Sequence, residues 1–75
     1  MNPLDRATQL SQIFNAFNHG NLPLSNQLIH VFLEQHPNDL EGIFTKGIIS
    51  SALGNYEDAI QAFEGILLVD PGNKT

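Results

Sequence analysis

A pattern that recurs after 34 residues constrains this chain of 75 residues more than any other feature. The stretch GNYEDAIQAFEGILLVDPGN occupies residues 54–73, and a diverged copy, GNLPLSNQLIHVFLEQHPND, occupies residues 20–39. Both stretches begin with Gly-Asn, and both carry a proline near the end. A fixed period of this length indicates a fold built from one repeated supersecondary unit.

The spacing of the apolar residues predicts α-helices. The first to recur at intervals of three and four residues are Leu10, Ile13, Phe14 and Phe17. This spacing places them on one face of a helix, whereas no segment alternates apolar and polar residues for long enough to indicate a strand. The same periodicity along the chain predicts four helices, near residues 4–18, 23–36, 40–53 and 57–69.

Glycine and proline mark the ends of these helices in the same way in both units. Gly20 and Gly54 follow the first and third helices, where a glycine accommodates the positive φ that often ends a helix. Pro37 and Pro71 stop the second and fourth helices. Asp39 then supplies an N-cap for the third helix. Because the connections are short, neighbouring helices are predicted to run antiparallel.

The second unit, residues 40–73, resembles a tetratricopeptide repeat, a family whose period is 34 residues. Ala59, Phe63 and Pro71 match the family's A-x3-F pair and the proline that follows it. Gly47 matches the small residue of the family's first helix. The corresponding positions of the first unit, which spans residues 6–39, are Ser25, Ile29 and Pro37.

The glycines inside the helices predict points of close packing. Two antiparallel helices approach closely only where a residue lacks bulk, so we expect Gly47 to lie opposite Ala59. Gly42 and Gly65 leave two alternatives open. Each marks either a close contact with a neighbouring helix or a surface position that tolerates a weak helix former.

The resemblance implies an all-α fold, in which two antiparallel helix-turn-helix hairpins stack as a short right-handed α-solenoid. Residues 1–75 would form a single domain, with one repeat at about 6–39 and the other at about 40–73. The resemblance also implies a binding scaffold whose partners lie along the concave face formed by the first helix of each hairpin. Alignment with the family places on that face Ala7, Leu10, Phe14, Phe17, Asn18, Glu41, Phe44, Ile48, Ser51 and Ala52.

The concave positions are mostly apolar, and this limits the kind of partner. Family members that bind chaperone tails resemble carboxylate clamps made of Lys, Arg and Asn, whereas Leu10, Phe14, Phe44 and Ile48 stand in those places here. We therefore predict a partner that is an amphipathic helix or an apolar peptide segment. The alternative is that these residues are core between packed helices, which helical spacing alone favours.

The fourth helix carries more apolar residues than one contact face can use. We expect Ile60, Leu67 and Leu68 to be covered by a second copy of the chain, most simply in a two-fold homodimer, or by a continuation beyond Thr75. A different role also stays open. Repeats of this family often precede catalytic domains such as bacterial glycosyltransferases and sulfotransferases, so the chain could be an accessory region that recruits substrate or partner.

Composition and charge argue against several other functions. The net charge of −5 repels phosphate backbones and anionic lipids, so no nucleic-acid or membrane partner is expected. The chain has no cysteine, and His30 and His36 are too far apart in sequence to share a metal by i, i+4 spacing. Glu57 and Asp58 open a helix, where carboxylates stabilise the macrodipole. We expect no enzymatic activity, no metal and no cofactor, and a cytoplasmic location because the start of the chain lacks a signal peptide.

Overall fold

The computed structural model describes residues 5–69, and this part of the chain is all-α with no strand. The helices are α1 (Arg6–Asn18), α2 (Leu22–Gln35), α3 (Leu40–Leu53) and α4 (Tyr56–Val69). The predicted boundaries differ from these by no more than two residues. Pro71, which was predicted to stop the fourth helix, lies outside the described residues.

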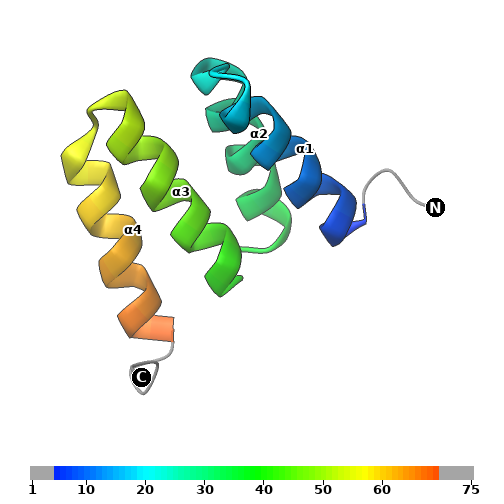
Figure 1. Ribbon diagram of the computed structural model, residues 1–75. Helices are drawn as coiled ribbons and strands as arrows, with labels where there is room; N and C mark the ends of the chain where they lie inside the picture. The colour runs from blue at the N-terminus through cyan, green and yellow to red at the C-terminus, as the bar shows by residue number, and fades with distance from the viewer. Residues whose placement is uncertain (1–4, 70–75) are drawn as a thin grey trace.

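The four helices form two antiparallel hairpins that stack side by side, as predicted (Figure 1). One hairpin consists of α1 and α2, and the other consists of α3 and α4. Contacts between α2 and α3 join the hairpins, so α3 lies inside the stack and α4 lies at its end.

The sequence repeat is also a repeat of backbone geometry. Gly20 and Gly54 follow α1 and α3 with φ values of +78° and +84°, as the sequence predicts. The amide of Asn21 donates to the carbonyl of Ala16, and the amide of Asn55 donates to the carbonyl of Ser50. The N···O distance is 2.9 Å in both bonds. These are the i to i+5 bonds of a Schellman motif, which needs a residue in the left-handed region. Both hairpins therefore turn in the same way.

Side-chain caps begin the two inner helices. Asp39 is the N-cap of α3, as predicted, and its Oδ1 accepts a hydrogen bond of 2.9 Å from the amide of Gly42. Asn21 caps α2 by accepting a longer bond of 3.4 Å from the amide of Leu24. Such caps satisfy an amide that the helix itself leaves without a partner.

The large core residues lie among α1, α2 and α3. Ile13, Ile29, Phe32 and Ile49 are at most 1% exposed and belong to one cluster. Between Tyr56 and Leu68 of α4, in contrast, the buried residues are alanines, Ala59 and Ala62. The first hairpin and α3 thus share a core of large buried side chains, whereas the large side chain that α4 packs on α3, Phe63, stays partly exposed.

Two glycines of α3 lie against aromatic rings on opposite sides of that helix. A Cβ at Gly42 would meet the Phe32 ring of α2 at 2.6 Å, which settles the open alternative in favour of close contact. A Cβ at Gly47 would meet the Phe63 ring of α4 at the same distance. The nearest side chain to Gly47 is therefore that of Phe63, one turn after Ala59 on α4, and the predicted contact of Gly47 with Ala59 stays a prediction. Gly65 has only an ordinary contact, 3.9 Å to Ile43.

Candidate protein-binding surface

The residues predicted for the concave face divide into core and surface. Leu10 is only 5% exposed and belongs to the core cluster, so its assignment to a binding surface is wrong. It lies on the inner side of α1, where it packs with the large residues between the hairpins. Phe17 is half-buried and packs against the same cluster. The core interpretation that helical spacing favoured therefore holds for these two positions.

The other predicted residues remain accessible. Phe44 on α3 is 50% exposed, and Ile48, one turn further on, is 36% exposed. Phe14 on α1, the counterpart of Ile48 in the first repeat, is 37% exposed. Asn18 is exposed, and Ser51 is half-buried. A partner could therefore contact large apolar side chains on α3 without disturbing the core.

Helix α4 adds a second row of exposed apolar residues. Ile60 and Leu67 are each 55% exposed, and Leu68 is 83% exposed. All three were predicted to lie outside the core. Phe63 lies between Ile60 and Leu67, and the centroid of its ring is 5.8 Å from the centroid of the Phe44 ring on α3. This ring contact makes one continuous surface of the two helices.

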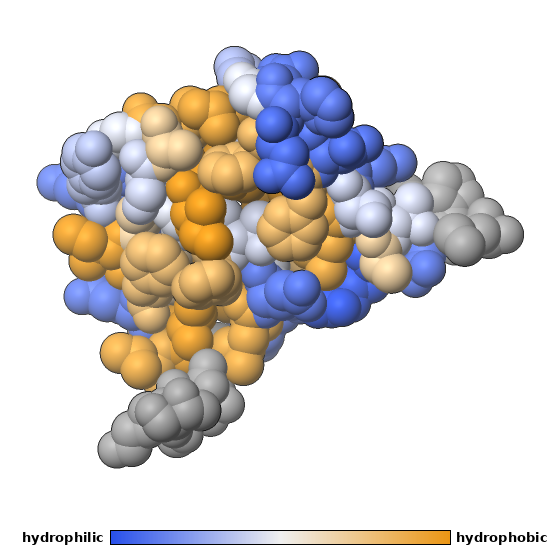
Figure 2. All heavy atoms as spheres, viewed as in Figure 1, coloured by the Kyte–Doolittle hydropathy of each residue, from blue (hydrophilic) through white to orange (hydrophobic). Residues whose placement is uncertain are grey.

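We call this surface the α3–α4 face, and it consists of Phe44, Ile48, Ile60, Phe63 and Leu67. Figure 2 shows apolar side chains gathered over α3 and α4, where the two helices lie side by side. Phe63 was predicted to belong to the repeat pattern and was not predicted to lie on a surface. The signal was its spacing, because Phe63 follows Ile60 by three residues and precedes Leu67 by four.

The charged residues beside the α3–α4 face are acidic. Glu57 and Glu64 are exposed on α4, three and four residues from Ile60, so they lie next to it on the helix surface. Lys46 lies two residues from both Phe44 and Ile48, which turns it away from the face. The border of the surface on α4 is therefore negative.

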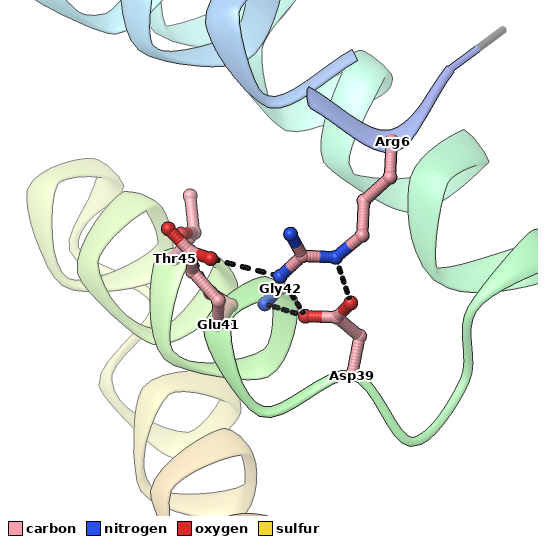
Figure 3. A network of polar contacts seen from close by, with 5 residues as sticks. All are labelled: Arg6, Asp39, Glu41, Gly42 and Thr45. Carbon is pink, nitrogen blue, oxygen red and sulfur yellow. Dashed lines mark hydrogen bonds and ion pairs between the residues drawn. The ribbon is translucent and has the colours of Figure 1, made fainter. Parts of the chain in front are cut away.

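A charge cluster joins the start of α1 to the start of α3 (Figure 3). The Arg6 guanidinium donates to both oxygens of Asp39, at 2.5 and 3.1 Å, and to Oε1 of Glu41 at 2.8 Å. Hydrogen bonds from Arg6 hold the pKa of the Asp39 carboxyl below its ordinary value, and the Gly42 amide acts in the same direction. Asp39 thus caps α3 and ties the second hairpin to the first.

Other chemistry finds little support in the described part of the chain. The hollow beside the α3–α4 loop is lined by Gly54, Asn55, Tyr56, Glu57 and Asp58. Its two carboxylates give it the wrong charge for a phosphate. Within residues 5–69, no three metal-ligating side chains are grouped, and none of the described helices has the length and apolar character needed to cross a bilayer.

Comparison with family models, curated proteins and solved structures finds no match to this chain. The fold and the surface together define an all-α protein of two stacked helical hairpins, with an exposed apolar face at one end of the stack.

Proposed function

We propose that this chain is a protein-interaction module of the tetratricopeptide-repeat type, which binds an amphipathic α-helix and acts in the cytoplasm. The observation that supports this proposal best is the α3–α4 face, where two helices present exposed apolar side chains joined by the Phe44–Phe63 contact. Contiguous exposed apolar surface on a small protein marks an interaction site.

The shape of this surface suits a helical ligand. Ile60, Phe63 and Leu67 form a row along α4, and Phe44 and Ile48 form a row along α3. A helix with apolar anchors at i, i+3, i+4 and i+7 can bury those anchors against two such rows.

Self-association is a second candidate. The exposure of Ile60, Leu67 and Leu68 supports it, because a two-fold contact between α4 helices would bury all three. Sedimentation at increasing protein concentration measures it directly, since a dimer would appear as a rise in mass.

Binding of a helix is tested by titrating ¹⁵N-labelled protein with a synthetic amphipathic helical peptide. We expect chemical-shift changes at the amides around Phe44, Ile60 and Leu67. Leu24 and Val31 on α2 serve as controls, because their exposures of 41% and 43% are similar but they lie off the face. Equal changes on α2, or no changes at millimolar peptide, would contradict the proposal.

A further inference from the structure

We infer that the occupant of the α3–α4 face is a helix with basic residues beside its apolar anchors, and that it docks as α3 docks on the first hairpin. The inference rests on the proposed function and specifies the partner. Two observations support the inference. The first hairpin shows what covers the equivalent positions there, and the charged residues at the border of the α3–α4 face are acidic.

Three residues of the α3–α4 face have buried or half-buried counterparts 34 residues upstream. Phe44 corresponds to Leu10 and Phe63 corresponds to Ile29, and exposure falls from 50% and 38% in the second hairpin to 5% and 0% in the first. Leu67, at 55% exposure, corresponds to the half-buried Leu33, which packs against the core cluster. These three positions are covered in the first hairpin and open in the second, whereas Phe14, the counterpart of Ile48, is 37% exposed and Asn26 stands in the place of Ile60.

Helix α3 is what covers the first hairpin. It contributes Ile49 to the core cluster and packs Leu53 against it. It also brings Gly42 up to the rings and methyl groups of Phe32 and Leu33. The second hairpin repeats the same backbone turn and leaves Phe44, Phe63 and Leu67 open where a helix covers the first hairpin, so the ligand that fits its open face is again a helix.

The charges distinguish the open face from its covered counterpart. Glu57 and Glu64 border the open face, whereas the equivalent positions of the first hairpin are Pro23 and His30. Neither of the described basic residues can neutralise these acids. Arg6 is engaged by Asp39 and Glu41, and Lys46 points away from the face.

A second copy of the chain fits this border poorly. A two-fold contact through α4 would bring Glu57 and Glu64 of both copies close together, in a protein that already carries a net charge of −5. Where the two hairpins meet inside the molecule, opposite charges face each other, as Arg6 does with Asp39 and Glu41. Lysine or arginine on the ligand would give the open face the same complementarity.

The test uses three synthetic helical peptides with identical leucine anchors and lysine, glutamine or glutamate at the flanking positions. Fluorescence anisotropy of the labelled peptides gives their affinities for the protein. We expect the lysine peptide to bind about tenfold more tightly than the glutamate peptide. Two surface ion pairs, one with Glu57 and one with Glu64, can contribute this difference at low salt. The difference should shrink at about 0.5 M salt, because screening acts on exposed charges.

Charge reversal locates the effect. The double variant Glu57→Lys, Glu64→Lys should reverse the order of the lysine and glutamate peptides. Glu34→Lys is the matched control, because Glu34 is exposed on α2, and it should leave the order unchanged. Leu67→Asp should weaken all three peptides at least about tenfold, whereas Val31→Asp should not.

The outcomes separate this inference from the function on which it rests. If the three peptides bind the face equally, helix binding stands and the preference for basic residues is overturned. If none of them binds, both are overturned. A dimer that Leu67→Asp dissociates, and that the lysine peptide leaves intact, would make a second copy the occupant and overturn the inference.

Discussion

The ring of Phe63 lies against the backbone of Gly47, so close that a Cβ at position 47 would come within 2.6 Å of two ring carbons. The same ring is 38% exposed and touches Phe44, so it belongs both to the packing of α3 on α4 and to the α3–α4 face. A substitution of Phe63 would change stability and binding together. Ile60 and Leu67 are better positions for separating the two.

Gly47→Leu should lower the free energy of unfolding by about 1–3 kcal/mol, because the added side chain must push the Phe63 ring away from α3. Urea denaturation followed by circular dichroism measures this change. An unchanged midpoint would mean that α3 and α4 do not approach each other closely at this point.

The same change, glycine to alanine, should have opposite effects at two other positions. Gly42→Ala is expected to destabilise the protein, because the new Cβ would lie 2.6 Å from the ring of Phe32, which is fully buried and has no room to move. Gly65→Ala should stabilise it by about 0.5–1 kcal/mol, since the nearest atom is 3.9 Å away and alanine is the better helix former. Thermal unfolding of the two variants gives the comparison, and effects of the same sign would contradict it.

Asp39→Asn should remove a pH-dependent part of the stability. The folded protein holds the pKa of Asp39 below its ordinary value of 3.8, so this contribution is fully present above that pH and is lost as the pH falls through the folded pKa. Asparagine retains a capping oxygen for the Gly42 amide but carries no charge, so it cannot form an ion pair with Arg6 and does not titrate. The stability difference between wild type and variant should therefore be constant from about pH 5 to 8 and shrink at lower pH.

Arg6→Gln supplies the control for the Asp39 prediction. It removes the partner and leaves the cap, so it should reduce the same acid dependence. The double variant should add little to Arg6→Gln, because Arg6→Gln already removes the pair with Asp39 together with the contact to Glu41. Additive losses would mean that Arg6 and Asp39 do not act as a pair.

The amides of α4 should exchange with deuterium faster than those of α2. Ile29 and Phe32 anchor α2 with no exposure, whereas α4 buries the smaller Ala59 and Ala62 and leaves Leu67 half in solvent. Local opening costs less where few large contacts are broken, so we expect at least about tenfold lower protection in α4. Equal protection, measured by exchange followed by NMR, would show that the helices open only together.

Gln9→Met should raise the free energy of unfolding by about 1 kcal/mol, because a buried acceptor without a partner is costly. Gln9 is 8% exposed, and its Oε1 has no hydrogen bond within the described part of the chain, although its Nε2 donates to Gln35 over 3.1 Å. Gln12→Met, at an exposed position of the same helix, is the control and should change little. A loss of stability for Gln9→Met would show that the amide is satisfied.

Local signals predicted the helices well because they act within a few residues. The apolar spacing identified each helix, and Gly20, Gly54 and Asp39 ended or began them as expected, since left-handed φ and N-capping depend on the nearest turn. The exposure of Ile60 and Leu67 also followed from counting apolar residues against one contact face.

Predictions about pairs of helices were less accurate, because spacing gives a face but not its neighbour. Leu10 and Phe14 share one side of α1, yet only Leu10 turns far enough inward to be buried. Gly47 was predicted to mark a close approach of α3 and α4, but its spacing did not identify the Phe63 ring as the nearest side chain. The contact of Arg6 with Asp39 spans 33 residues, and no local pattern indicates it.

The position of α3 has a consequence for where the chain can be divided. By sequence, α3 opens the second repeat, but Ile49 and Gly42 complete the core of the first hairpin. A fragment ending at Asp39 would uncover Ile29 and Phe32, whereas one ending at Leu53 would keep them covered. The smallest fragment that keeps this core covered therefore contains three helices, one more than a repeat. The repeated unit of the sequence and the unit that buries the core differ by one helix.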